Sequence, residues 1–246
     1  MRNFKLLLEY DGSRYRGWQR LADTDLTIQG KLEAVLTRMT GVAVEVIGSG
    51  RTDAGAHAKG QVANFHCSTL KSCEEILEYL RQYLPEDIGV ISLEEVSPRF
   101  HSRFHAVEKT YRYRIWNSDA PNVFARKYTW KMTEPLNIHA MREGAKRFLG
   151  EHDFLAFCSN KHFKKSSVRR ISSFEIQQEG PEIWFTVSGD GFLYNMVRIM
   201  VGTLVAIGRG SMDVEDIPVI LEARIREKAG ETAPAKGLCL MEVRYE

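Results

Sequence analysis

The sequence predicts an α+β fold made of two successive split β-α-β units. Three observations predict it: segments in which apolar residues alternate, segments with apolar residues at helical spacing, and one order of these segments, β-α-β-β-α-β, that occurs twice in 246 residues. The boundary is expected between residues 1–104 and 105–246. In each half the helices should cover one face of an antiparallel sheet and leave the other face open to a ligand.

The elements of the first half have clear start and stop signals. They are, in order, a strand over Phe4–Tyr10, a helix after Thr27, strands over Val42–Ile47 and Gln61–His66, a helix after Ser72 and a strand over Ile88–Val96. Thr27 is a suitable N-cap for the first helix. Ser72 and Glu75 form a capping box for the second helix, which should stop at Pro85.

The second half repeats this order without any residue-level repeat. Its elements are a strand over Thr110–Trp116, a helix from Ile138 to Leu149, a hairpin of residues 171–176 and 182–187, a long helix from Phe192 to Ile207, a helix over Ile217–Arg226 and a strand over Leu238–Tyr245. Gly150 should end the first of these helices. Residues 121–135 carry no readable pattern.

Composition and spacing exclude several classes of protein. There are 34 Lys and Arg against 32 Asp and Glu, so a polyanion must be held by local basic clusters. No apolar run approaches the ~20 residues of a membrane span, and the first strand begins too early for a signal peptide. We therefore expect a cytoplasmic protein without membrane contact. The four cysteines lack the paired spacing of zinc ligands, so no metal site is expected.

The most informative stretch is the glycine-rich segment Gly48–Phe65. Its glycines and alanines surround Arg51 and Asp53, so the backbone could come close to a bulky substrate. It does not match a phosphate-binding Walker loop, because Arg-Thr follows the second glycine and no helical pattern comes next. The alternative is an ordinary turn with a solvated Asp53. Arg51, two residues earlier, would share any site at Asp53.

Five segments carry a family resemblance, in order along the chain. They are YDGSRYRGWQR (Tyr10–Arg20), RTDAGAHA (Arg51–Ala58), EKTYRYRIWN (Glu108–Asn117), FLYNMVRIMVG (Phe192–Gly202) and GLCL (Gly237–Leu240). Together they resemble the signature segments of the TruA family of tRNA pseudouridine synthases. The family motif reads RTDAGVHA, and Ala56 in place of valine removes two methyl groups but no functional atom.

The resemblance implies an isomerase that breaks the N-glycosidic bond of uridine, turns the uracil and rejoins it through C5. Family members have two tandem ferredoxin-like halves whose antiparallel sheets join around a central cleft. They act as homodimers on the anticodon stem-loop of tRNA, at positions 38, 39 and 40, without cofactor or metal. The isomerisation itself involves no redox change and no net hydrolysis, so its chemistry does not demand a cofactor.

The resemblance also assigns catalytic roles. Asp53 matches the catalytic aspartate, a nucleophile that attacks either C6 of the base or C1′ of the ribose. Desolvation in a pocket would raise the pKa of this carboxyl, so a neighbouring cation is needed. Arg198 lies off the apolar stripe of its helix and matches the arginine that the family places against the aspartate. The alternative is an exposed helix arginine.

Two further residues match family positions that meet the substrate. Tyr111 matches the active-site tyrosine, whose ring could stack on the uracil and whose hydroxyl lies near the C5 proton. Tyr113 shares its strand face, so a core tyrosine is the alternative. Arg51 resembles the residue that fills the place of the extruded base, since a paired uridine must be flipped out at a cost of a few kcal/mol. A contact to phosphate alone is the alternative. His57 is expected to be structural.

Three basic clusters are predicted to hold the RNA. They are Arg14, Arg16 and Arg20 with Tyr15 and Trp18; Arg99, Arg103 and Lys109 with Phe100 and Phe104; and Lys161, Lys164, Lys165, Arg169 and Arg170. The predicted substrate-binding residues among them are Arg14, Arg16, Phe100, Arg103, Lys164, Lys165, Arg169 and Arg170. Solvated loops are the alternative interpretation.

Two other functions are compatible with the element order. A non-catalytic RNA-binding module of the RRM type would carry a Lys/Arg-Gly-Phe/Tyr pattern on its third strand, and QVANFHC lacks it. A small-molecule enzyme on the same scaffold is also possible, because a fold does not fix a function. It would leave the three basic clusters unexplained.

Overall fold

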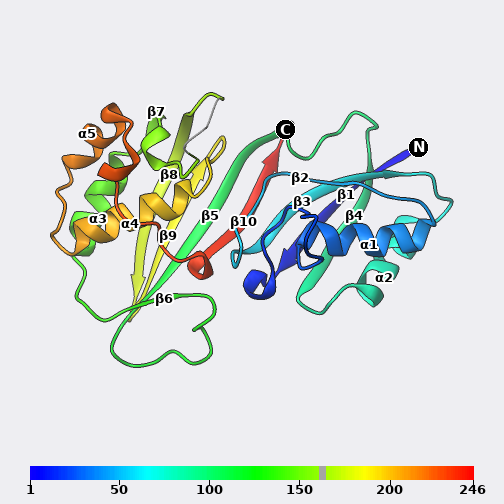
Figure 1. Ribbon diagram of the computed structural model, residues 1–246, viewed down its shortest axis with the longest axis horizontal. Helices are drawn as coiled ribbons and strands as arrows, with labels where there is room; N and C mark the ends of the chain where they lie inside the picture. Colours follow the sequence, from blue (N-terminus) through cyan, green and yellow to red (C-terminus); the bar gives the residue numbers. More distant parts are fainter. Residues whose placement is uncertain (161–164) are drawn as a thin grey trace. The chain divides into compact units, whose positions relative to one another are not determined.

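The computed structural model describes residues 1–160 and 165–246 (Figure 1). It divides into two compact units, one formed by Met1–Val107 with Cys239–Glu246 and the other by Glu108–Leu238. The expected boundary after residue 104 would assign the last strand to the second half. The structure differs because β10 (Leu238–Tyr245) pairs in parallel with β3 (His57–Cys67) of the first unit. Chain order alone does not reveal a sheet neighbour.

The first unit has the predicted element order. Its elements are β1 (Arg2–Tyr10), the short η1 (Gly12–Arg14), α1 (Ile28–Thr40), β2 (Val46–Gly48), β3, α2 (Cys73–Tyr83) and β4 (Ile88–Val96). The strand order is β4-β1-β3-β10, and β2 pairs with β3. Both predicted caps are present: Thr27 accepts a hydrogen bond from Gly30 N, and Ser72 with Glu75 forms a complete capping box.

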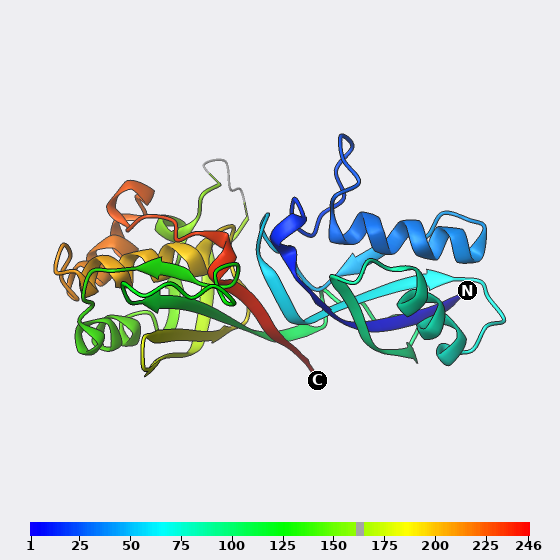
Figure 2. The same cartoon turned by 90° about the horizontal axis from the view of Figure 1, so that it is seen from below.

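One face of this sheet is closed and the other is partly open. Phe4, Leu6 and Leu8 on β1 are fully buried, as are Ile28, Leu32 and Leu36 of α1. This helix lies on one side of the strands (Figure 2). The side chains between them point to the opposite face, where Lys5 and Leu7 remain half-exposed. Alternation along one strand thus separates the core from a surface that can take part in binding.

The second unit holds the remaining elements of the chain. They are β5 (Ala106–Asn117), β6 (Trp130–Met132), α3 (Ile138–Lys146), β7 (Gly150–Asp153), η2 (Leu155–Phe157), β8 (Val168–Glu179), β9 (Glu182–Gly189), α4 (Met196–Gly208), α5 (Asp216–Ala223), η3 (Arg226–Lys228) and η4 (Ala235–Gly237). The strand order is β5-β9-β8-β7, and β6 pairs in parallel with β5. β8 and β9 form the predicted antiparallel hairpin.

Several element boundaries differ from the prediction. β2 is confined to Val46–Gly48, and β3 begins at His57, inside the segment expected to be a loop. α3 ends at Lys146 instead of Leu149, because Phe148 packs among Phe154 and Phe157 beyond the helix. β6 and β7 were not predicted. They contain three and four residues, too few to show a period, and exist through pairing with longer strands.

The structure confirms the mixed α+β class. No helix in the described ranges is long and apolar enough to span a membrane. All four cysteines are free thiols. Residues 1–160 and 165–246 contain no group of three or more His, Cys, Asp or Glu side chains arranged to hold a metal ion.

Candidate active site

Asp53 lies on a tight turn between β2 and β3 in the first unit. The turn is closed by a hydrogen bond from Ala56 N to Asp53 O at 3.1 Å. Gly55 has a φ of +79°, in the left-handed region that favours glycine, and its N–H donates to Tyr15 O at 3.2 Å. The Asp53 side chain is half-buried, while Arg51 is exposed. The turn therefore holds the carboxylate in a defined place at the surface of this unit.

The segment after β1 packs directly against this turn. Gly12 N donates to His57 Nδ1 at 3.0 Å, and Trp18 N donates to Thr52 O at 3.1 Å. A Cβ on Gly12 would lie 1.8 Å from Ala56 O, so only glycine fits there. His57 is buried, and its bond to Gly12 gives it a structural role, although the partner lies in the segment after β1 and not in the same loop. The two family-like segments of the first unit thus form one structure.

The aromatic residues of the first basic cluster do not face solvent. Tyr15 is 5% exposed and Trp18 is 2% exposed. Trp18 packs beneath Gly48, where a Cβ would lie 2.5 Å from its ring. The sequence placed these rings in a cluster at the RNA surface, whereas both belong to the core under the Asp53 turn. Sequence alone does not show which side of a loop faces inward.

The cations of that cluster are exposed, and two of them have acidic partners. Arg20 Nη1 lies 2.9 Å from the buried carboxylate of Glu33, and Arg14 Nε lies 3.7 Å from Asp87. Arg16 is exposed as well. The cluster therefore presents positive charge to solvent, although Arg20 also has a structural contact.

Tyr111 lies on β5 of the second unit and is 7% exposed. Its ring meets Phe192 edge-to-face, with the ring centroids 5.1 Å apart. Tyr113, two residues on, is fully buried and donates to Pro234 O at 2.7 Å. The two tyrosines share a strand face, but they have different neighbours. Tyr111 packs beside Phe192, which belongs to the family-like segment that opens α4.

Arg198 lies on α4 and is fixed by two hydrogen bonds. Its Nε donates to Ala233 O at 2.6 Å, and its Nη1 donates to Asn195 Oδ1 at 2.8 Å. The side chain is half-buried, so the alternative of a fully exposed helix arginine does not describe it. Asn195 precedes the helix with a φ of +62°, which places its amide beside the guanidinium. No sequence pattern pointed to Asn195.

The other predicted RNA-binding residues have mixed surroundings. Arg103 is exposed, whereas Phe100 is half-buried, with its ring centroid 5.2 Å from that of Tyr245. Lys165 and Arg170 are exposed, and Arg169 donates to Ser166 O and Val168 O. Lys161 and Lys164 lie outside the described residues. Each predicted cluster thus contributes some exposed positive charge.

A buried amide pair that sequence reasoning missed anchors the loop carrying Phe100 and Arg103. Asn64 Nδ2 donates to Asn3 Oδ1 at 3.0 Å, and Asn64 Oδ1 accepts from Ser102 N at 2.9 Å. Both asparagines are almost fully buried. A polar residue at a central strand position, such as Asn64 in QVANFH, was the available signal.

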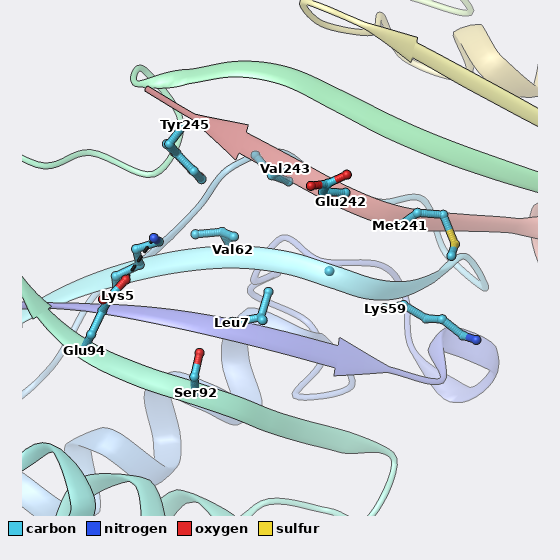
Figure 3. A pocket seen from close by; sticks show the side chains of 11 residues that line it. Lys5, Leu7, Lys59, Val62, Ser92, Glu94, Met241, Glu242, Val243 and Tyr245 are labelled. Atoms are coloured by element: carbon cyan, nitrogen blue, oxygen red, sulfur yellow. Dashed lines mark hydrogen bonds and ion pairs between the residues drawn. The ribbon is translucent and has the colours of Figure 1, made fainter. Parts of the chain in front are cut away.

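A groove lies on the partly open face of the first unit (Figure 3). It is lined by Lys5, Leu7, Lys59, Gly60, Val62, Ser92, Glu94, Met241, Glu242, Val243 and Tyr245. Lys5 Nζ on β1 and Glu94 on the neighbouring β4 form an ion pair at 3.0 Å. None of the predicted catalytic residues lines this groove, and its mixed charges do not favour a polyanion.

Comparison with known proteins identifies the family. The chain matches the family model described as tRNA pseudouridine synthase over residues 7–105 and 145–246. It is 50% identical over 240 residues to tRNA pseudouridine synthase A of Bacillus sp. (strain KSM-64), covering 98% of each chain. It is 47% identical over 245 residues to tRNA pseudouridine synthase A 2 of Bacillus cereus (strain ZK / E33L), covering 100% of each chain.

A solved structure gives a much weaker likeness. The crystal structure of a Cbf5-Nop10-Gar1 complex aligns with a TM-score of 0.37 at 13% identity, over 86% of this chain and 44% of that chain. The family assignment rests on the full-length sequence matches. The chain belongs to the TruA family of tRNA pseudouridine synthases, and it is an isomerase.

Proposed function

We propose that this enzyme converts uridines 38, 39 and 40 of the tRNA anticodon stem-loop to pseudouridine, with Asp53 as the nucleophile. One observation carries the proposal: the carboxylate of the RTDAGAHA motif lies half-buried on a turn that is braced by the other family-like segment of the same unit. A solvated surface Asp would not need such support. The tRNA substrate follows from the family, and the positions follow from the motif resemblance.

The reaction balances with groups that this chain supplies. Asp53 forms a covalent bond at C6 or at C1′, and the bond between C1′ and N1 breaks. The uracil turns, C1′ bonds to C5, and the bond to Asp53 breaks, which regenerates the carboxylate. The C5 proton leaves while N1 gains a proton. No oxidant and no net hydrolysis is required. In this proposal Tyr111 stacks on the uracil, with its hydroxyl near the departing C5 proton.

Arg198 is proposed to keep Asp53 ionised. A carboxylate in a closed site is favoured by a cation within ~4–6 Å. The bonds from Arg198 to Ala233 O and Asn195 Oδ1 hold the guanidinium in a fixed orientation, which suits this task. The family resemblance also implies that both halves of the chain are ferredoxin-like.

Base flipping is proposed for paired target uridines, because Asp53 cannot reach an atom inside the stack. Arg51 is exposed and lies two residues from Asp53, so its guanidinium could occupy the vacated space. The exposed cations of the three basic clusters would hold the phosphates. We also propose that the enzyme is a cytoplasmic homodimer, as the family resemblance implies.

If the three basic clusters contact the phosphate backbone of tRNA, the affinity for tRNA should fall steeply as the salt concentration rises. With about six phosphate contacts, the affinity should fall by about a thousandfold between roughly 50 and 200 mM salt. Filter binding with unmodified tRNA at several salt concentrations measures the slope. An affinity that stays constant across this range would contradict the assignment of the basic clusters.

The proposed function is tested by tritium release from C5-labelled uridine in tRNA transcripts. Wild-type enzyme should release label from a tRNA with uridine at positions 38 to 40 and none from a transcript with cytidine there and labelled uridine elsewhere. Equal release from both transcripts would show that the modified uridines do not lie at positions 38 to 40 of the anticodon stem-loop. Labelled free uridine is the control: release from it at the tRNA rate would indicate a small-molecule enzyme, and no release from any substrate would indicate a binding module.

A further inference from the structure

A chain of buried polar side chains lies directly behind the turn that carries Asp53. The preceding residue, Thr52, is 7% exposed and turns its side chain into the protein. Its hydroxyl lies 2.8 Å from the phenol oxygen of Tyr10, at the end of β1. Its carbonyl accepts a hydrogen bond from Trp18 N at 3.1 Å. Both the side chain and the main chain of Thr52 are therefore held.

The direction of the bond between Tyr10 and Thr52 follows from the second partner of the phenol. Gln61 Nε2 can only donate, so its 3.4 Å contact uses a lone pair of the Tyr10 oxygen. The single phenol proton is then directed to the Thr52 hydroxyl. Burial raises the pKa of Tyr10 above its ordinary value, because the phenolate would be poorly solvated. The phenol keeps this proton at physiological pH.

The same cluster also holds the beginning of the turn. Gln61 Nε2 donates to Gly50 O at 3.1 Å, and Gln61 Oε1 accepts from Ser49 Oγ at 2.7 Å. The chain is thus tied to the buried cluster on both sides of Arg51. Neither Tyr10 nor Gln61 is exposed to an RNA ligand, since both are almost fully buried.

We propose that the Tyr10 phenol is a positioning residue for Asp53 and acts through Thr52. The inference rests on the proposed role of Asp53 as nucleophile. Thr52 and Asp53 share one planar peptide unit, so a bond that fixes Thr52 restricts the direction of the carboxylate. A misplacement of about 1 Å can lower a rate about 100-fold. Because Tyr10 is buried, its effect falls on the chemical step and not on tRNA binding.

Three variants test the hydrogen bond between Tyr10 and Thr52 by changing each partner in turn. Tyr10→Phe removes only the hydroxyl, Thr52→Val removes its partner, and Thr52→Ser keeps the partner. In single-turnover tritium release, the first two should slow the reaction about 10- to 100-fold, while Thr52→Ser stays near the wild-type rate. The dissociation constant for tRNA should change by less than about twofold in all three. The double variant Tyr10→Phe/Thr52→Val should be no slower than the slower single variant, because both remove one bond.

Thr129→Val is the matched control. Thr129 is 2% exposed, and its hydroxyl donates to Ala125 O at 3.0 Å in the second unit. Its loss should lower the Tm and leave the rate unchanged. A folded Tyr10→Phe enzyme at the wild-type rate, or equal slowing by Thr129→Val and Thr52→Val, would overturn the inference. If Asp53→Asn is inactive while Tyr10→Phe is fully active, the positioning role of Tyr10 is rejected and the proposed function stands. An active Asp53→Asn enzyme would instead reject the proposed function.

Discussion

Asp53→Asn should lower the single-turnover rate of tritium release by at least about a thousandfold, because an amide is not a nucleophile that can form the covalent intermediate. The substitution keeps the size of the side chain. The bonds that shape the turn, from Ala56 N to Asp53 O and from Trp18 N to Thr52 O, involve only the main chain and should persist. The variant should therefore bind tRNA as the wild type does.

The control for this variant is Asp23→Asn. Asp23 is an exposed acid in the loop between η1 and α1, so its change removes the same charge without touching the turn. Its rate should match the wild type. An Asp53→Asn enzyme that releases tritium at a rate comparable to Asp23→Asn would remove Asp53 from the mechanism. A loss of rate accompanied by an equal loss of tRNA affinity would assign Asp53 to binding.

Local signals predicted much of the fold. The strands Ile88–Val96 and Leu238–Tyr245 have the predicted bounds, and the caps at Thr27 and Ser72 are formed. These features depend on a few neighbouring residues, which the sequence displays directly. Sheet order depends on contacts between distant segments. The parallel pairing of β10 with β3 could therefore not be predicted, and the expected boundary at residue 104 assigned β10 to the other half.

The candidate site was predictable in residue type but not in orientation. Motif resemblance selected Asp53 and Arg198, yet it could not show that Asn195 and Ala233 hold the guanidinium. The basic-cluster interpretation placed Trp18 at the RNA surface. The structure uses Trp18 as a core residue beneath Gly48, because the segment after β1 folds back onto the Asp53 turn. This folding back is determined by tertiary packing, which produces no periodic pattern in the sequence.

That packing predicts a severe defect from a single methyl group. Gly12→Ala would put a Cβ 1.8 Å from Ala56 O and 2.7 Å from its carbonyl carbon, both main-chain atoms that cannot rotate away. Either η1 or the turn must move, and the bonds from Gly12 N to His57 Nδ1 and from Ala56 N to Asp53 O are at risk. We expect a loss of about 1–3 kcal/mol in the free energy of unfolding. The single-turnover rate should fall about 100-fold or more.

Gly89→Ala separates this effect from the general cost of replacing a glycine. The three atoms nearest to a Cβ at Gly89 all belong to the flexible side chain of Glu9, the closest being Cγ at 3.2 Å, and β4 accommodates alanine. Urea unfolding and single-turnover tritium release should therefore show little change in Gly89→Ala and a clear loss in Gly12→Ala. If Gly12→Ala unfolds at lower urea but keeps the wild-type rate, the Asp53 turn tolerates displacement. The carboxylate would then not depend on the contact between the two family-like segments.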